Sequence, residues 1–317
     1  MSVETEQFTA LAESLRSPDV NQRRLALAEL EENLRVVPAE LLIPSLRDED
    51  AAVRRLAAQL LEEIGDVAAI PALIHVTADS AADVASVAAS ALREFRTPHA
   101  VPLLISGIDH PKPEARVAAL IALREHKADG AMATLIRAVS DSVPEVRREA
   151  IITLTHLRHA GSLPVLRESL NDVSAPVRRI AIGAVAVFND AASIPDLARS
   201  LGDDDWQVRR EAAIALGKFS SNEAIESLIR ALNDAYWQVA KEALASLGKL
   251  HAPVAVRLAP FAKHEIADVR LAAASALGET GERSARDPLT ELLNDPDTGV
   301  QKAARRALEQ LAAKTAS

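Results

Sequence analysis

The sequence contains no cysteine, few aromatic residues and no long hydrophobic run. Of its 317 residues none is Cys, 3% are Phe, Trp or Tyr, and 11 are Gly. Without Cys, the chain has no disulfide, no Cys-ligated zinc or iron–sulfur cluster and no thiolate nucleophile. No 18 consecutive residues are apolar, and the start, MSVETEQFTA, lacks the basic end and apolar run of a signal peptide. We therefore expect a soluble, cytoplasmic protein without a membrane partner.

The composition favours closely packed helices and a protein partner over a nucleic acid. Hydrophobic residues make up 49% of the chain and charged residues 26%, which is ample material for a core and carries no signature of disorder. The apolar residues are mostly Ala, Leu, Val and Ile, which suit a core of small side chains on helices. The formal net charge is −9, whereas nucleic-acid-binding domains tend to be strongly basic.

Ten segments of the chain repeat at a spacing of 31 residues, except for one interval of 30 residues between Val239 and Val269. Each repeat has an anchor position, an Ala four positions later and an apolar residue eight positions later. These offsets lie on one face of a helix, so each repeat is predicted to contain an inner helix with a constant buried stripe. The anchors are Gln22, Val53, Val84, Ala115, Val146, Val177, Val208, Val239, Val269 and Val300.

A second helix is predicted before each inner helix, as in residues 69–79 and 193–203. Pro71 and Pro195 occupy the same column there, and Pro fits the first turn of a helix because its missing N–H would be unbonded anyway. Most repeats have Asp five positions before the anchor and Arg one position after it. A carboxylate at the turn between two helices accepts hydrogen bonds from free backbone N–H groups. We interpret the two columns as a structural ladder between neighbouring repeats.

The last repeat differs from the others at the position five residues after the anchor. This position is apolar in nine repeats and is Arg305 in the tenth. It should therefore face the following repeat, and the charge should cap the end of the array, as solenoid ends require. We predict one solenoid over residues 1–311 rather than two globular domains, followed by a frayed tail at 312–317.

A motif that recurs in the array resembles a known repeat family. The segment Asp203–Phe219, DDDWQVRREAAIALGKF, recurs in a similar form over 234–250. It resembles the short HEAT-like repeats of the phycobilisome-lyase (PBS lyase) type, and the resemblance covers essentially the whole chain. It implies an all-α, right-handed α–α superhelix of about ten 31-residue repeats whose inner helices line a concave binding surface. Because the family includes scaffolds, bilin lyases, chaperone-like proteins and a few enzymes, it implies a fold rather than an activity.

Aromatic and basic side chains gather at the offsets that the resemblance places on the concave surface. Basic residues stand two positions after the anchor in repeats five to eight, and the two tryptophans stand two positions before it in repeats seven and eight. Ten positions after the anchor, repeats one to four carry Glu, and repeats seven and eight carry Lys. Arg and large aromatic residues are typical of interaction hot spots, so we predict a site for another protein with an acidic or amphipathic surface. The predicted site comprises Arg148, His156, Arg179, Trp206, Gln207, Arg210, Lys218, Tyr236, Trp237, Gln238, Lys241 and Lys249.

Two less specific interpretations of the same residues stay open. Trp at this offset is common in the family and would then only cover the start of the inner helix. The basic residues are followed by Glu149, Glu211 and Glu242, so the face is alternatively a solvated surface of mixed charge.

No catalytic or metal-binding set is recognised in the sequence. Deoxyhypusine hydroxylases, which belong to this family, place His-Glu pairs on the inner helices to hold two irons. The corresponding positions here are Arg148-Glu149, Arg210-Glu211 and Lys241-Glu242, with no His. His156 and His159 lie within one helical turn but lack a third ligand nearby in the sequence. We therefore predict no metal and no cofactor.

The sequence favours a non-catalytic protein-binding scaffold or an assembly or maturation accessory factor. Two alternatives rest on the family resemblance. One is a bilin-lyase-like protein or pigment-protein chaperone, in which Trp206, Trp237 and basic residues would meet the pigment and its propionates. The other is a HEAT-like glycosylase that removes alkylated bases from DNA, which the net charge of −9 opposes.

Overall fold

The structure, a computed structural model, is all helical over the residues that it describes. These are residues 3–32, 37–126 and 129–316, with side chains described for 8–30, 37–126 and 130–313. The chain divides into two units, 1–162 and 163–317, each of which contains five of the ten predicted repeats. The all-α solenoid predicted from the sequence is confirmed.

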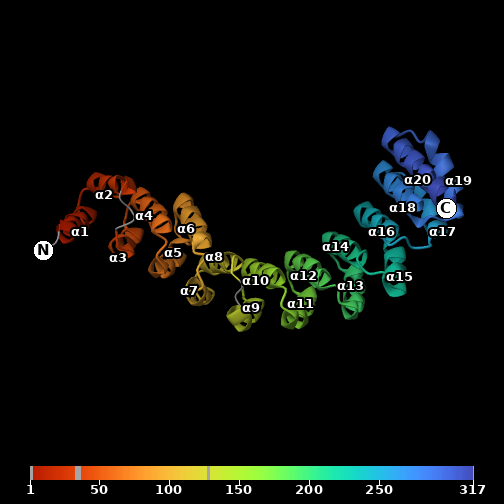
Figure 1. The fold of residues 1–317 in the computed structure, drawn as a ribbon. Coiled ribbons are helices and arrows are strands. Elements are labelled where there is room, and N and C mark those ends of the chain that lie inside the picture. The colour runs from red at the N-terminus through yellow and green to blue at the C-terminus, as the bar shows by residue number, and fades with distance from the viewer. Residues whose placement is uncertain (1–2, 33–36, 127–128, 317) are drawn as a thin grey trace. The chain divides into compact units, whose positions relative to one another are not determined.

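The first unit contains helices α1 to α10, and each repeat contributes an odd-numbered helix followed by an even-numbered one (Figure 1). The even-numbered helices carry the anchors, and we call them inner helices; the odd-numbered ones are outer helices. Their bounds are α1 (Val3–Leu15), α2 (Val20–Ala28), α3 (Ala39–Leu42), α4 (Ala51–Ile64), α5 (Ile70–Val76), α6 (Ala82–Glu94), α7 (Ala100–Gly107), α8 (Pro113–Leu123), α9 (Met132–Ala138) and α10 (Pro144–Leu157).

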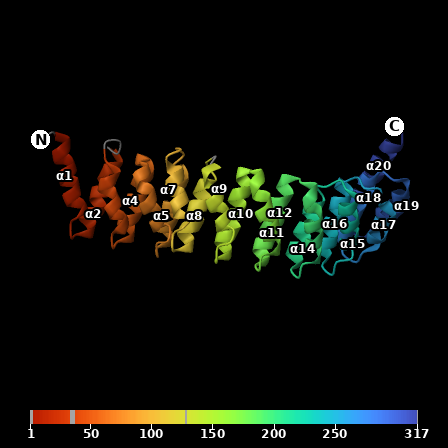
Figure 2. The same ribbon diagram turned by 90° about the horizontal axis from the view of Figure 1, so that it is seen from below.

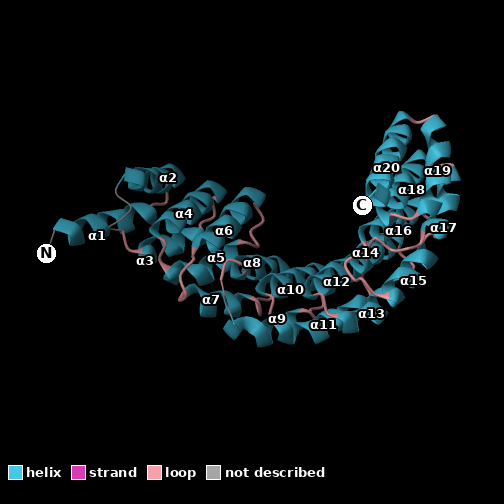
Figure 3. Cartoon of the chain, turned by 45° about the vertical axis from the view of Figure 1, so that its right-hand side comes forward, coloured by secondary structure: helices cyan, strands magenta, loops and turns pink. Residues whose placement is uncertain are grey.

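The second unit repeats this two-layer arrangement with helices α11 to α20. Its inner helices α14, α16 and α18 lie side by side (Figure 2) and occupy the inside of the bend of this unit (Figure 3). The bounds are α11 (Leu163–Glu168), α12 (Ala175–Phe188), α13 (Ile194–Arg199), α14 (Trp206–Leu216), α15 (Asn222–Ala231), α16 (Trp237–Lys249), α17 (Ala255–Leu258), α18 (Ala267–Thr280), α19 (Arg286–Glu291) and α20 (Thr298–Ala316).

The buried stripe of the inner helices matches the predicted repeat pattern. In repeat eight, Val239, Ala243 and Leu247 are all fully buried, and the same three offsets are buried throughout the middle of each unit. Five positions after the anchor, Leu244 is fully buried whereas Arg305 of the last repeat is exposed. The position that is apolar in the first nine repeats is therefore charged and exposed in the tenth.

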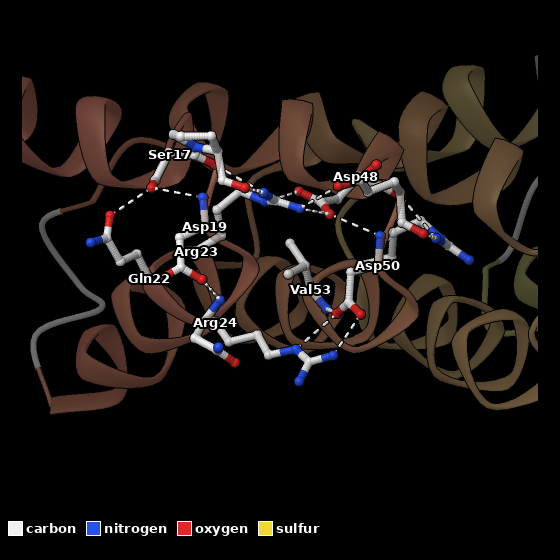
Figure 4. Close-up of polar contacts among 12 residues, drawn as sticks. Ser17, Asp19, Gln22, Arg23, Arg24, Asp48, Asp50 and Val53 are labelled. Atoms are coloured by element: carbon white, nitrogen blue, oxygen red, sulfur yellow. Dashed lines mark hydrogen bonds and ion pairs between the residues drawn. The ribbon is translucent and has the colours of Figure 1, made fainter.

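The Asp and Arg columns form the predicted ladder between repeats. Arg54 donates from Nε and Nη2 to both carboxylate oxygens of Asp79 in the next repeat, at 2.6 and 2.8 Å. Its Nη1 donates to the backbone carbonyl of Asp48 at 2.8 Å, and Asp79 accepts from the backbone N–H of Ala81 at 2.8 Å. Figure 4 shows the equivalent contacts of Arg23. The same Arg–Asp pairing joins Arg23 to Asp48, Arg54 to Asp79, Arg116 to Asp141, Arg178 to Asp203, Arg209 to Asp234 and Arg270 to Asp295.

Where the Arg of the ladder is absent, its carboxylate partner is absent too. Ala85 and Ala240 take the place of Arg, and the following repeats have His110 and His264 in place of Asp. Each imidazole keeps one role of the missing Asp, because its Nδ1 accepts from the backbone N–H two residues later, at 3.2 and 3.1 Å. Burial lowers the pKa of His110, which favours the uncharged ring. Because the Arg and the Asp of the ladder are replaced together, no partly buried carboxylate is left without a cation.

The last inner helix continues beyond the predicted end of the array at Leu311. Helix α20 extends to Ala316, while Ser317 and the side chains of 314–316 lie outside the described residues. Gln301 takes the place of the ladder Arg in this final repeat, and it donates to the carbonyl of Asp295 at 2.7 Å. The side-chain bond to the carbonyl of the preceding turn is thus kept within this repeat.

Candidate partner-binding surface

Three aromatic side chains stand at the N-terminal ends of two neighbouring inner helices. Trp206 is the first residue of α14, Tyr236 is the N-cap of α16, and Trp237 is the first residue of α16. The rings of Trp206 and Tyr236 stack with an interplanar angle of 7° and a centroid separation of 5.6 Å. Tyr236 remains 47% exposed. We call these three residues the aromatic rim.

Two cations lie against the aromatic rim. The guanidinium carbon of Arg209 is 5.5 Å from the ring centre of Tyr236, and Lys241 Nζ is 5.7 Å from that of Trp237. A cation over an aromatic face is attracted by the negative charge of that face. These contacts hold the Tyr236 and Trp237 rings against neighbouring side chains.

The basic column of the second unit is largely paired with acceptors in the following repeat. Arg179 Nη1 donates to Gln207 Oε1 at 2.7 Å. Arg210 Nη2 lies 3.1 Å from Glu242 Oε1, and Lys241 Nζ lies 2.7 Å from Asp268 Oδ2. The partner of each base therefore stands one repeat further along, not at the adjacent position in its own helix. The carboxylates offset the charges of Arg210 and Lys241 and support the mixed-charge interpretation for these two residues, whereas Arg179 is bonded to a neutral amide.

The two predicted lysines lie at the opposite end of the same helices. Lys249 is the last residue of α16, about 18 Å from Trp237 at a rise of about 1.5 Å per residue. Lys218 follows the end of α14, and both lysines are exposed without an ion pair in the part of the chain that the structure describes. The half-buried Ile214 and Ala245 belong to the stretch of helix between the two ends. The predicted residues of this unit thus form two separated groups rather than one cluster.

The remaining predicted residues have different surroundings. Gln238 is half-buried, and its Oε1 is sheltered with no donor among the described residues. Arg148 and His156 belong to α10 of the first unit, where Arg148 is half-buried and His156 is exposed. Glu149, which follows Arg148, forms an ion pair with Arg124.

The acidic column of the first unit lies at the C-terminal ends of its inner helices. Glu63, Glu94 and Glu125 are exposed, while the side chain of Glu32 lies outside the described residues. Burial, together with the charges of Glu94 and Glu63, raises the pKa of the neighbouring Glu62. Glu94 and Glu125 lie at ion-pair distance from Arg96 and Arg93, at 3.7 and 3.9 Å, so the negative charge of this column is partly neutralised.

No metal site is found among the described side chains, since no three His, Asp or Glu residues are grouped so that they could hold an ion. Of the helices in the described ranges, none has both the length and the apolar character needed to span a bilayer.

One member of the surface is missed by the sequence interpretation. Arg209 is assigned there only to the ladder, yet it also contacts Tyr236. The signal is present in the sequence, because Tyr236 stands two positions after Asp234, the ladder partner of Arg209. The spacing does not specify the rotamer of Tyr236, which brings its ring against Arg209.

A family model of HEAT repeats matches residues 8–93, 101–186, 169–248 and 254–317. The chain belongs to the HEAT-repeat family. The model of the PBS lyase HEAT-like repeat matches residues 84–110 of this HEAT-repeat protein, in agreement with the resemblance noted in its sequence.

Solved structures share the fold of this HEAT-repeat protein at low sequence identity. An engineered protein is 22% identical with a TM-score of 0.53, and the match covers 96% of this chain and 98% of that one. Importin beta is 15% identical with a TM-score of 0.63, covering 99% of this chain and 52% of that one. Kap95p, in a structure with RanGDP, is 14% identical with a TM-score of 0.64, covering 98% and 52%. The chain therefore spans about half the length of the last two proteins, and no curated protein matches its sequence.

Proposed function

We propose that this HEAT-repeat protein is a non-catalytic scaffold or assembly accessory factor that binds another protein on its inner helices, mainly in repeats five to eight. The observation that carries the proposal is the aromatic rim, in which the stacked Trp206 and Tyr236 stand on successive repeats with Tyr236 47% exposed. Exposed aromatic side chains next to arginine have the composition of an interaction hot spot.

The rim is held rigid by the fold, which favours binding. Arg209 is fixed by Asp234 at 2.6 Å, and its guanidinium lies against Tyr236. A side chain that is already immobilised loses little conformational entropy when a partner covers it. An exposed aromatic ring that is already immobilised is therefore suited to bind a partner protein.

The charges near the rim favour a partner with an acidic or amphipathic surface. Lys218 and Lys249 are exposed and have no ion pair in the described part of the chain. Ile214 offers apolar area between them and the rim. Kap95p, which is similar in fold, binds RanGDP, and this use of a HEAT-like solenoid to hold a protein supports the proposal.

The test compares the wild-type chain with the triple variant Trp206→Ala, Tyr236→Ala, Trp237→Ala. Each is used to capture partners from a lysate of the source cell, and each captured protein is then purified and titrated by calorimetry. We expect one partner to bind wild type and to bind the triple variant at least about 30-fold more weakly, because hot-spot truncations cost about 2 kcal/mol or more. The control variant Val256→Ala, Arg257→Glu alters exposed residues of the outer helix α17 and should bind like wild type.

Circular dichroism and thermal melting confirm that each variant is folded before binding is compared. A partner that binds the folded triple variant as tightly as wild type would contradict the role of the rim. Nucleic acid or a visible chromophore in the eluate, without a protein partner, would contradict the scaffold function itself and favour one of the two family-based alternatives.

A further inference from the structure

A groove of about 390 Å³ lies between the last two inner helices, α18 and α20, away from the aromatic rim. None of its lining residues belongs to the predicted binding surface. It is lined by Leu271, Ser275 and Glu279 from α18, and chiefly by Gly299, Lys302, Ala303 and Arg306 from α20.

The groove forms because α18 and α20 are in close contact along one line and carry only small residues beside it. A Cβ on Gly278 would lie 2.7 Å from the Cα of Ala307, so the two helices touch along this line. Closer to the mouth, Ser275, Gly299 and Ala303 are too short to fill the space between the helices. Leu271 leans towards Gly299, since its Cδ1 lies 3.5 Å from where a Cβ on that glycine would stand.

The two walls of the groove differ in chemistry. Leu271 is 39% exposed and takes the position that is Arg or Lys in the four preceding repeats, so the α18 wall is apolar at this end, whereas Ser275 and Glu279 make it polar further along the helix. Lys302 and Arg306 make the α20 wall cationic. Both are exposed, and within the described ranges neither has a carboxylate at ion-pair distance.

Lys302 differs in this respect from the corresponding bases of the preceding repeats. In the preceding repeats the base two positions after the anchor reaches an acceptor in the next repeat, as Arg210 reaches Glu242 and Lys241 reaches Asp268. Lys302 occupies the same position in the tenth repeat and has no such acceptor among the described residues. Lys302 and Arg306 thus present two exposed cations on one face of α20 to an anionic group.

We propose that this groove binds a short acidic and aliphatic segment of a partner protein. An aliphatic side chain of the segment packs on Leu271 and Ala303, and two of its carboxylates pair with Lys302 and Arg306. From Leu271 to Glu279 the groove wall spans eight residues, or about 12 Å, which matches three to four residues of extended chain. A simple anion would leave the apolar wall uncovered, and an uncharged apolar segment would leave both cations unpaired. This inference rests on the proposed function because the occupant is a protein. The residues that bind it are not those of the aromatic rim.

The probe is a fluorescein-labelled hexapeptide of alternating Asp and Leu, and its binding to the full chain is followed by fluorescence anisotropy. We expect Lys302→Glu and Arg306→Glu each to weaken binding at least about tenfold, because each reverses a charge that faces the carboxylates. The matched control is Arg305→Glu, which makes the same change one residue away at an exposed side chain outside the groove. It should change affinity less than about twofold. Leu271→Ala should weaken binding about fivefold through lost apolar contact.

Four results would overturn the inference: no binding of the peptide to wild type, equal effects of Arg305→Glu and Arg306→Glu, equal affinity for the hexapeptide with Asn in place of Asp, or complete displacement by inorganic phosphate at matched ionic strength. The last result would indicate a simple anion site. The triple variant of the aromatic rim should bind the peptide like wild type. Loss of peptide binding alone thus rejects the groove, whereas unaltered partner capture by the rim variant rejects the proposed function.

Discussion

Arg209 holds Tyr236 in place through the same carboxylate that joins two repeats. Its Nε donates to Asp234 Oδ2 at 2.6 Å, and its guanidinium carbon lies 5.5 Å from the Tyr236 ring centre. The backbone N–H of Tyr236 donates to Asp234 Oδ1 at 2.8 Å, so one Asp fixes both partners of the cation–π contact. The ladder between repeats and the aromatic rim are therefore one continuous network.

Replacing only the Arg of a ladder pair should lower the free energy of unfolding more than replacing both the Arg and its Asp. In Arg209→Ala the carboxylate of Asp234, whose side chain is 10% exposed, loses its cation. We expect the free energy of unfolding to fall by about 2–4 kcal/mol, since a sheltered charge without a partner is costly. The double variant Arg209→Ala, Asp234→His copies the natural combination of Ala240 and His264, and it should recover at least half of that loss. Urea denaturation of the four members of the cycle measures the coupling, and additive effects of the two single changes would contradict it.

Stability should fall steeply between pH 4 and pH 2. Hydrogen bonds from Arg24 hold the pKa of Asp50 at about 2, compared with 3.8 for an ordinary Asp. The pKa of Asp79 is likewise lowered by its hydrogen bonds with Arg54. Since these pKa values lie below those of the unfolded chain, the stabilisation is complete above about pH 4 and is lost as the carboxylates are protonated below it.

Thermal melting as a function of pH tests this expectation. The variant Asp50→Asn should melt at a lower temperature than wild type at pH 7, and the difference should shrink as the pH falls to 2. The control Asp204→Asn changes an exposed carboxylate without an ion pair in the described part of the chain, and its melting curve should follow that of wild type at every pH. A constant difference between wild type and Asp50→Asn across the range would contradict the lowered pKa.

The same substitution should have opposite effects at two glycines of the inner helices. An Ala at position 278 of α18 would place its Cβ 2.5 Å from the Cβ of Ala307, so α18 and α20 must move apart. Gly278→Ala should therefore cost about 1–3 kcal/mol. At Gly183 of α12 the nearest atom would be Glu211 Oε1 at 3.8 Å, so Gly183→Ala should stabilise the helix by about 0.5–1 kcal/mol. Urea midpoints of the two variants check the signs, and a stabilised Gly278→Ala would show that the contact is not tight.

The exposed Arg at the end of the array should prevent association between chains. Arg305→Leu restores the apolar residue found at this position in the other nine repeats, where it is covered by the next repeat. We expect concentration-dependent self-association, because an uncapped solenoid end offers a surface for a second chain. Sedimentation velocity at several concentrations measures it. Arg305→Gln keeps the end polar and should remain like wild type, whereas a monomeric Arg305→Leu would contradict the capping role.

The repeat number, the two-layer arrangement, the buried stripe and the ladder were determined by the sequence alone. Each follows from a column that recurs every 31 residues, and in a solenoid each repeat meets only its neighbours. A side chain such as Ala243 then has the same surroundings in every repeat, so ten copies of one pattern specify its burial.

The tertiary structure alone decided which side chains of neighbouring repeats meet. Arg210 pairs with Glu242 of the next repeat and not with the adjacent Glu211, and Trp206 stacks on Tyr236, thirty positions away. The groove beside Lys302 likewise depends on the distance between α18 and α20. A periodic offset specifies the face of a helix on which a residue lies, but contacts across repeats depend on helix spacing and on the rotamer of each side chain. Helix spacing and rotamers both depend on how neighbouring repeats pack. The residue types at one repeat position do not specify that packing.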